Sequence, residues 1–256
     1  MIMAAVLGGL VWWGYQYNFG FPDGISEQSA ITLHFWNGTW IAAFGVGILT
    51  WGLMLFASVA YRRRRGDDTP KQLRYNIPIE VLYTVTPIAM VLALVFFTVR
   101  DEAQLTKVSN DQAETVNVTG FRWSWTFYYA DQDVYDTGIP SLQDEAALPV
   151  LWLPVDEKVQ FHLGSPDVIH SFWVPDFLFK LDVIPGRDNV FEVTPNEVGT
   201  FAGKCAELCG VDHSRMLFNV KVVERAEFDQ HMAELKAKGQ TGDPDSGRVN
   251  DAAQGV

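Results

Sequence analysis

The sequence predicts a two-helix transmembrane hairpin followed by an all-β Greek-key sandwich or barrel. Two long uncharged stretches, residues 40–61 and 81–99, predict the hairpin. Short runs of β-branched and aromatic residues, separated by Pro, Gly and Asp, fill residues 101–224 and predict the β-domain. Because 48% of the 256 residues are hydrophobic and 13% are aromatic, general disorder is excluded.

The first 30 residues are expected to form a signal-like segment and an external arm. The segment MIMAAVLGGLVWW is apolar but shorter than a bilayer crossing, and it resembles part of a signal-peptide core. It contains no Ala-x-Ala cleavage site and no cysteine for lipidation, so its processing stays open. Residues 14–30 are assigned to the external arm.

The hairpin is assigned to residues 31–100, with spans at about 38–61 and 79–99. The stretch from Trp40 to Tyr61 carries no charge over 22 residues, which at ~1.5 Å per residue crosses a hydrocarbon core of ~30 Å. A buried core helix is the alternative, but Arg62 and Arg100 end the two stretches directly. The aromatic residues near the span ends also favour membrane interfaces: Trp36, Trp40, Tyr61 and Tyr83.

The loop between the spans, residues 62–75, is basic. Its charged residues are Arg62, Arg63, Arg64, Arg65, Lys71 and Arg74 against Asp67 and Asp68. The positive-inside rule places this loop in the cytoplasm, and therefore places the N-terminal arm and everything after Arg100 on the outer face. Four consecutive arginines also suit a nucleic-acid site, but their position between two spans favours topology as the explanation.

The net charge of −12 then belongs to the outer domain and the tail, because the cytoplasmic loop is basic. A negative outer face steers positively charged partners, although acidity also serves solubility alone.

The outer domain is assigned to residues 101–224, and six of its segments are predicted as strands: TVNVTGFRWSWTFYY, ALPVLWLPVDEKVQFHL, DVIHSFWVP, DNVFEVTP, GTFAGKC and MLFNVKVVE. Residues 225–238 predict a short packing helix with Phe228, Met232 and Leu235 on one face. The polar tail, residues 239–256, is expected to be disordered.

The segment CAELCGVDHSRM, residues 205–216, holds the only two cysteines of the chain. A disulfide between them would close a very small loop and add little stability. Structural zinc favours closer cysteine spacing and a second pair of ligands, and it has no use for a thioether. Thiolate, imidazole and a weak thioether on a β-sandwich are the ligands of copper electron-transfer sites. Since a mononuclear blue site uses one cysteine, the second thiolate suggests two bridged coppers.

A bridged copper pair needs a second imidazole, and His170 in DVIHSFWVP is the best candidate. A lone histidine in a β-domain is more often structural, but the C-x3-C-x3-H-x2-M spacing favours the ligand role. His162 and His231 lack such a context, and we expect both to be structural or exposed.

Together these residues resemble cytochrome c oxidase subunit II, over nearly the whole chain. The resemblance is carried by the two spans and by four segments: GFRWSWTF, SPDVIHSFWVP, the KxDxIPGR stretch at 180–187, and CAELCGVDHSRM. It implies a cupredoxin-like Greek-key domain that holds a dinuclear, mixed-valence copper centre called CuA. The sequences of the arm segment GFPDGIS and of RYNIPIE resemble those of actinobacterial members of the family.

The resemblance implies a role for each matched residue of the metal site. The implied ligands are His170, Cys205, Glu207, Cys209, His213 and Met216. The two cysteines would bridge both coppers, each histidine would bind one, and the methionine and the Glu207 backbone carbonyl would be weak ligands.

Three more residues gain roles from the resemblance. Trp123 would lie where electrons enter, Glu80 would stand at the entrance of a proton channel, and the Glu207 side chain would reach a Mg or Mn ion shared with subunit I. Their alternatives are core packing, an interfacial helix cap and a solvated carboxylate. The matched residues Lys180, Asp182 and Arg187 face subunit I in the family, without an assigned role.

The implied function is that of the electron-accepting subunit of an aa3-type cytochrome c oxidase. This proton-translocating oxidoreductase of the respiratory chain takes electrons from cytochrome c at CuA and passes them to haem in subunit I, where oxygen becomes water; the chain alone would be inactive. A membrane-anchored copper-delivery protein and a purely structural membrane-anchored β-domain are the alternatives. Quinol-oxidase subunits lack the copper ligands, and nitrous oxide reductase is soluble and has a propeller domain.

The implied partners are oxidase subunit I, the other oxidase subunits, membrane lipid and a cytochrome donor, with no nucleic acid. No C-x-x-C-H haem motif follows the domain, so the donor would be a separate protein. Tyr128 lies where an acid is common around the docking patch, although Asp167 is retained. This departure favours a dihaem cytochrome of a bc complex, held in a supercomplex, over a free soluble cytochrome c. The implied location is the bacterial plasma membrane, as a multi-pass protein.

Overall fold

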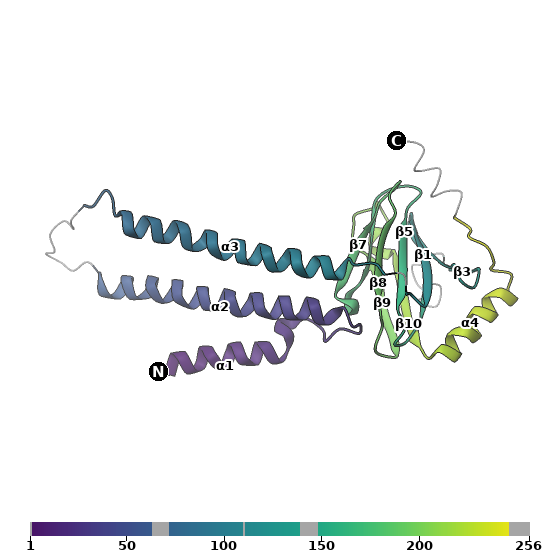
Figure 1. Ribbon diagram of the computed structural model, residues 1–256, viewed down its shortest axis with the longest axis horizontal. Coiled ribbons are helices and arrows are strands. Elements are labelled where there is room, and N and C mark those ends of the chain that lie inside the picture. Colours follow the sequence, from purple (N-terminus) through teal and green to yellow (C-terminus); the bar gives the residue numbers. More distant parts are fainter. Residues whose placement is uncertain (1, 63–71, 110, 139–147, 246–256) are drawn as a thin grey trace. The chain divides into compact units, whose positions relative to one another are not determined.

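The fold is that of a computed structural model, which describes residues 2–62, 72–109, 111–138 and 148–245. The chain divides into two compact units. One unit comprises residues 1–21 and 33–102, and the other comprises residues 22–32 and 103–256. The first unit is helical and the second is a β-domain with a C-terminal helix (Figure 1).

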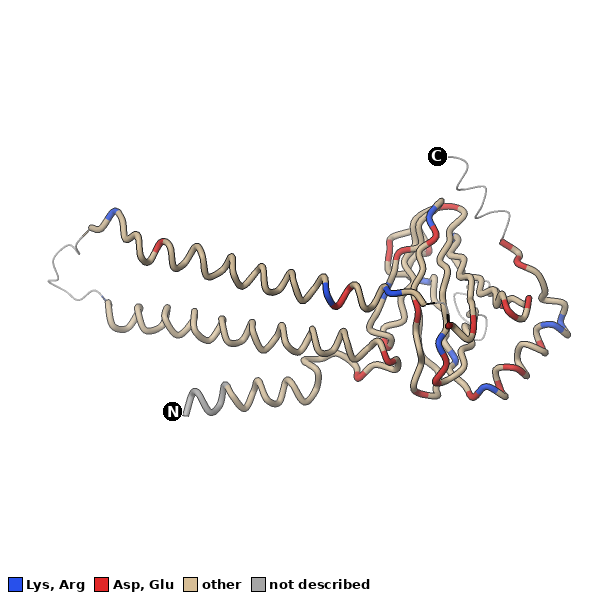
Figure 2. The backbone as a smooth tube through the Cα atoms, in the orientation of Figure 1, with Lys and Arg blue, Asp and Glu red and all other residues tan. Residues whose placement is uncertain are grey.

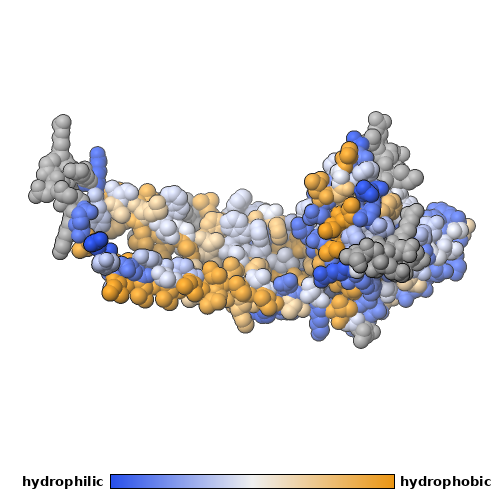
Figure 3. Space-filling model, turned by 90° about the horizontal axis from the view of Figure 1, so that it is seen from above, coloured by the Kyte–Doolittle hydropathy of each residue, from blue (hydrophilic) through white to orange (hydrophobic). Residues whose placement is uncertain are grey.

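The helical unit contains the predicted hairpin. Helix α2 spans Ser29–Ala60 and α3 spans Ile77–Leu105, and both are long and apolar enough to cross a membrane. Figure 2 shows α2 almost free of charge, and Figure 3 shows apolar side chains along the helices. Bare apolar surface of this extent is costly in water and suits lipid. The prediction of two apolar helices before a β-domain is therefore confirmed, while most of the predicted basic loop, residues 63–71, lies outside the described residues.

The first span begins earlier than the charge-free stretch indicated. Helix α2 starts at Ser29, where the backbone N–H donates to the hydroxyl of Ser26 at 3.2 Å. Its first turns carry aromatic contacts, such as the stacking of Trp36 on Phe21 with ring centroids 4.2 Å apart. The N-terminal segment expected to be signal-like forms helix α1, Ile2–Gln16, followed by a short turn of helix, η1, at Asn18–Gly20. The Trp36 indole donates to the Asn18 carbonyl at 2.9 Å and so fixes this turn on α2.

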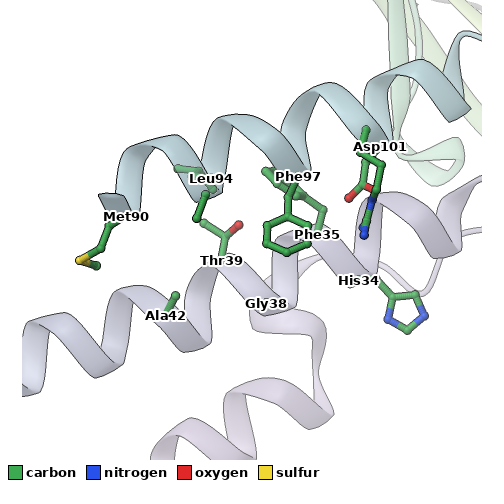
Figure 4. Close-up of a pocket in the computed structure, with 11 residues that line it drawn as sticks. His34, Phe35, Gly38, Thr39, Ala42, Met90, Leu94, Phe97 and Asp101 are labelled. Atoms are coloured by element: carbon green, nitrogen blue, oxygen red, sulfur yellow. The ribbon is translucent and has the colours of Figure 1, made fainter. Parts of the chain in front are cut away.

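Between α2 and α3 lies a mainly apolar pocket of about 460 Å³. Figure 4 shows Met90, Leu94 and Phe97 projecting from α3 toward Thr39 and Ala42 of α2. Gly38, Thr39, Ala42 and Ala93 are small lining residues, and they leave this space between the two helices.

Part of the predicted external arm belongs to the β-domain. Ile25 is 5% exposed; its backbone N–H donates to the Asp176 carbonyl, and its carbonyl accepts from Asn196, both at 2.9 Å. Ser29 is also buried, and its hydroxyl donates to the Phe177 carbonyl at 3.1 Å. The arm is therefore a structural element of this domain and not a free segment.

The β-domain is a sandwich of two five-stranded sheets, ordered β3-β2-β1-β5-β8 and β4-β10-β9-β6-β7. The pairs β1–β5 and β4–β10 are parallel and the other pairs are antiparallel. The chain crosses from one sheet to the other after β3, β4, β5, β7 and β8, and the predicted Greek-key sandwich is confirmed. The strands are β1 Glu114–Phe121, β2 Ser124–Tyr129, β3 Val134–Thr137, β4 Val150–Pro154, β5 Val159–Gly164, β6 His170–Val174, β7 Phe179–Val183, β8 Asn189–Val193, β9 Gly199–Cys205 and β10 Leu217–Val223.

The strand pattern differs from the prediction in four places. Two predicted segments are each split by a turn, between β1 and β2 and between β4 and β5. The second turn contains Asp156 with a φ of 57°, a conformation that an aspartate tolerates. Two further strands, β3 and β7, were not predicted, because both are edge strands with exposed or charged residues and a weak apolar pattern.

The core between the sheets is aromatic. Trp125 of β2 lies 5.8 Å from Phe172 of β6 and 5.4 Å from Phe218 of β10, measured between ring centroids. Phe161 of β5 and Phe191 of β8 stack at 4.9 Å. All five side chains are 2% exposed or less, so these rings fix the spacing of the two sheets.

Helix α4, Arg225–Ala237, packs on the domain with Phe228, Met232 and Leu235 buried. Arg225 fixes its first turn: its guanidinium binds Glu114 at 2.5 Å and also holds both carboxylate oxygens of Glu157. The tail differs from expectation, because the backbone of Gln240 accepts from Tyr135 at 3.1 Å and residue 241 bridges to β3. Residues 246–256 of the predicted disordered tail lie outside the described residues.

We predict that Arg225→Met lowers the free energy of unfolding by about 2–3 kcal/mol. The Glu114 side chain is 4% exposed and would keep a buried charge without its cation. The matched control Lys158→Met removes a pair with Asp111, whose side chain is 73% exposed, and should cost under about 1 kcal/mol. Urea unfolding of the full chain in detergent, followed by tryptophan fluorescence, measures both values; equal losses would contradict the role of Arg225.

Candidate metal centre

The candidate metal ligands lie on the hairpin connection between β9 and β10 and at the start of the neighbouring strand β6. Cys205 ends β9, and the chain returns through a short turn of helix, η4, at His213–Arg215 to Met216, just before β10. Strands β9 and β10 are antiparallel partners, and the Cys205 N–H donates to the Met216 carbonyl at 3.0 Å. His170 begins β6, which pairs with β9 on the other side, so Phe172 lies opposite Cys205. Sheet pairing therefore collects residues from distant parts of the chain.

The donor atoms converge around the two sulfurs, which are 3.9 Å apart. The Nδ1 of His170 lies 3.9 Å from the Cys205 sulfur, and the Nδ1 of His213 lies 3.6 Å from the Cys209 sulfur. The Met216 thioether lies 3.7 Å from the Cys209 sulfur, and the Glu207 carbonyl oxygen lies 3.2 Å from the Cys205 sulfur. All six predicted ligands are brought together. The two thiols are free, so the disulfide alternative does not describe this structure.

The centre is shielded from water on most sides. His170 and Met216 are 0% exposed, and each cysteine is 5% exposed. Trp125 ties the site to the core, because its indole donates to the Met216 carbonyl at 3.4 Å and its ring lies 6.2 Å from the imidazole of His170. Two thiols and a thioether are soft donors and two imidazoles also suit copper, so this buried set, with one carbonyl oxygen as a further donor, fits a copper site.

Protonation of the donor atoms couples metal binding to proton release. Burial raises the pKa of the Cys209 thiol to about 12, and the neighbouring Cys205 adds to the shift. Burial also lowers the pKa of His170 and favours the neutral imidazole that a metal requires. A metal must therefore displace the thiol proton of Cys209 when it binds.

Asp167 orients the His170 ring. The carboxylate accepts from His170 Nε2 at 2.9 Å, which leaves Nδ1 facing Cys205. Burial alone would raise the pKa of Asp167, but hydrogen bonds from His170 and from the N–H groups of Arg122 and Val168 outweigh it and lower the pKa. Sequence reasoning kept Asp167 as a surface carboxylate and missed this contact, although the spacing of three residues before His170 was a signal for it.

Trp123 lies against the loop of residues 206–212 between β9 and η4, which we call the metal loop. It follows β1 and is half-buried, and its indole donates to the Cys209 carbonyl at 3.3 Å. Gly210 has a φ of 128°, and a Cβ there would lie 3.1 Å from the Trp123 ring. A glycine at this position therefore allows the indole to cover the loop.

The side chains of the remaining candidate residues lie outside the cluster of donor atoms. The Glu207 side chain is exposed, whereas its carbonyl faces the site. Glu80 lies in the first turn of α3, where its carboxylate accepts from the N–H of Asn76 at 2.9 Å, so it serves as a helix cap. His162 bonds Asp188 at 2.8 Å and His231 stacks on Trp152 at 3.9 Å, away from the metal ligands.

Two family models match the chain. The model described as "Cytochrome C oxidase subunit II, transmembrane domain" covers residues 14–100, and the one described as "Cytochrome C oxidase subunit II, periplasmic domain" covers residues 114–223. The probable cytochrome c oxidase subunit 2 of Streptomyces avermitilis is 47% identical, over 87% of this chain and 81% of that protein. Cytochrome c oxidase subunit 2 of Corynebacterium glutamicum is 33% identical, over 84% and 75%.

A solved structure is also similar. The crystal structure of the periplasmic domain of subunit II of cytochrome oxidase of Bradyrhizobium japonicum is 30% identical, with a TM-score of 0.48, over 51% of this chain and 99% of that one.

We predict that Asp167→Asn weakens copper binding by about 10–100-fold, because the ring of His170 loses the carboxylate that orients it. The matched control is Asp188→Asn, which removes a carboxylate from His162, a histidine away from the metal ligands. Competition with a copper chelator measures the affinity of both variants. If Asp188→Asn has the same effect, Asp167 has no special role.

Proposed function

Since the chain belongs to the cytochrome c oxidase subunit II family, we propose that it accepts electrons from cytochrome c at a dinuclear CuA centre. It then passes them to haem in subunit I of an aa3-type oxidase, where oxygen is reduced to water. The chain is a membrane-anchored subunit of a haem–copper oxidase, an oxidoreductase complex. The observation that carries the proposal is the convergence of six soft or neutral donor groups in one buried site.

The residues that would hold the copper pair are Cys205 and Cys209 through their thiolates and His170 and His213 through Nδ1, with the Met216 thioether and the Glu207 carbonyl as weaker ligands. When bound, a copper pair supplies a single electron shared over two metals, with small changes in bond length on transfer. The chain's own residues supply the rest. The core excludes water, and Asp167 holds the proton on Nε2 of His170 so that Nδ1 stays free. A rigid environment without water keeps the reorganisation energy of electron transfer small.

Trp123 is proposed as the residue through which electrons enter. Its indole is half-buried and donates a hydrogen bond to the Cys209 carbonyl. From that carbonyl the covalent bonds of Cys209 lead to the sulfur, which is a proposed ligand. This contact supports the proposal independently of the family resemblance.

Glu207 and Glu80 are proposed to serve the interface with subunit I and the proton path. The exposed side chain of Glu207 is available to a Mg or Mn ion shared with subunit I, while its carbonyl stays at copper. Glu80 is a carboxylate at the end of a span, and its cap on Asn76 holds it there. Its cap role and a role at the entrance of a proton channel are compatible.

The proposed location is the bacterial plasma membrane, as a multi-pass protein with the basic loop in the cytoplasm and the copper domain on the outer face. The proposed partners are subunit I, the other oxidase subunits and a cytochrome donor, either cytochrome c or a dihaem cytochrome of a bc complex in a supercomplex. A copper-delivery role is disfavoured, because delivery needs exposed and exchangeable ligands, whereas four of the proposed ligand residues are buried: His170, Cys205, Cys209 and Met216.

Electron paramagnetic resonance with metal analysis tests the copper centre. We expect the copper-loaded full chain to bind two coppers and to give the seven-line hyperfine pattern of a shared electron. Cys209→Ser should abolish that pattern, since one bridge is lost, whereas Met216→Leu should keep both coppers and shift the reduction potential. A mononuclear four-line signal from the wild-type chain would overturn the proposal.

The role of Trp123 is tested by the rate at which the copper centre is reduced by cytochrome c in stopped-flow measurements. We expect Trp123→Phe to slow reduction by about tenfold or more while leaving the copper signal unchanged, because the hydrogen bond to the Cys209 carbonyl is lost. Trp152→Phe is the control, since Trp152 stacks on His231 away from the metal ligands. Equal rates in the two variants would exclude Trp123 as the path.

A further inference from the structure

The pocket between α2 and α3 is apolar along most of its length and polar at one end. Figure 4 shows Met90 at one end of the pocket and His34 and Asp101 at the other. Met90, Leu94 and Phe97 are each 44% exposed, so the apolar part is open to the surroundings of the helices. An open apolar pocket with a polar end suits an amphiphilic ligand, which has an apolar chain and a polar headgroup.

The length of the pocket matches half of a bilayer. Along α3 the lining residues run from Met90 to Asp101, a separation of eleven positions that corresponds to about 16 Å along the helix axis. Half of a hydrocarbon core of ~30 Å is about 15 Å, which is the depth that the acyl chains of one leaflet fill. The volume of about 460 Å³ lies in the range of small-molecule sites. An acyl chain of one leaflet therefore fits the pocket.

Small residues on both helices border the apolar part of the pocket. A Cβ added at Gly38 of α2 would meet no heavy atom within 4 Å, and Ala42 lies one helical turn further along. Ala93 lines the pocket from α3. Small residues between membrane helices usually let the two backbones approach closely. Here they border a pocket instead, so the space is available to a ligand.

The polar end of the pocket matches a headgroup that carries both signs of charge. Arg100 lines this end with a side chain that is 52% exposed, and its Nε and Nη2 donate to one carboxylate oxygen of Asp101, both at 2.7 Å. Guanidinium groups bind phosphate well, and the exposed imidazole of His34 is a second N–H donor at this end. Because the Arg100–Asp101 pair has no net charge, it complements a zwitterionic headgroup better than an anionic one.

We propose that this pocket binds one zwitterionic phospholipid of the outer leaflet, with an acyl chain between α2 and α3 and the phosphate at Arg100 and His34. Arg100 lies five residues before the end of α3 at Leu105, and His34 lies five residues after the start of α2 at Ser29. Both residues are therefore at the span ends next to the β-domain in sequence, which the proposed topology places at the outer face. The bound chain fills the space between the spans. This inference goes beyond the proposed function, because it does not depend on copper.

The test is native mass spectrometry of the full chain in a maltoside detergent, titrated with phosphatidylethanolamine. We expect binding to saturate at one lipid per chain. Gly38→Leu should weaken this binding by about tenfold or more, because the leucine side chain occupies the apolar pocket. Gly45→Leu is the matched control, since Gly45 is an exposed residue of the same helix with open space around it but does not line the pocket. We expect its affinity to equal that of the wild type.

Diacylglycerol, which lacks the phosphate, tests the assignment of the headgroup. Arg100→Gln should weaken the binding of phosphatidylethanolamine by about tenfold and leave that of diacylglycerol unchanged, because the lost contact is with the phosphate. An equal loss for both lipids would overturn the assignment of the phosphate to Arg100. Equal affinities of Gly38→Leu and Gly45→Leu, or binding that does not saturate at one lipid, would overturn the site. The copper resonance should be the same in all variants, so the proposed function is judged separately.

Discussion

The antiparallel pairing of β9 with β10 is the constraint on which the metal centre depends. It places Cys205 beside the Met216 carbonyl at 3.0 Å, and the connecting loop then has to hold the other ligands within one small volume. Pairing of β6 with β9 brings in His170 from a different connection. A change in register by one residue would turn Cys205 away from the core, because strand side chains alternate between faces. The site therefore inherits its geometry from backbone hydrogen bonds.

The aromatic core makes the surroundings of the candidate ligands rigid and excludes water from them. Trp125 contacts the core rings and also donates to the Met216 carbonyl, so packing between the sheets and the position of a ligand are coupled. Asp167 adds the orientation of His170. Because Trp125 and Asp167 hold these donor groups in position, a metal that binds there would have to displace the thiol proton of Cys209.

Charged residues are distributed differently in the membrane spans and in the β-domain. The two spans carry apolar side chains outward, which suits hydrocarbon, whereas the acidic residues gather in the β-domain (Figure 2). Beside the metal loop the local charges are paired, by contrast with the acidic domain as a whole.

The sequence by itself predicted the two membrane spans and the sandwich, which depend on charge-free length and strand pattern. Ligand spacing and the family resemblance also predicted the six candidate ligands, whose donor atoms the structure brings together. The sequence did not determine the early start of α2 at Ser29, the edge strands β3 and β7, or the burial of Ile25 in the β-domain. Nor did it determine that Asp167 holds His170 and that Trp123 bonds the Cys209 carbonyl. Only the tertiary structure decided these, because each depends on contacts between residues distant in the chain or on the direction of a side chain, and neither is encoded in local periodicity.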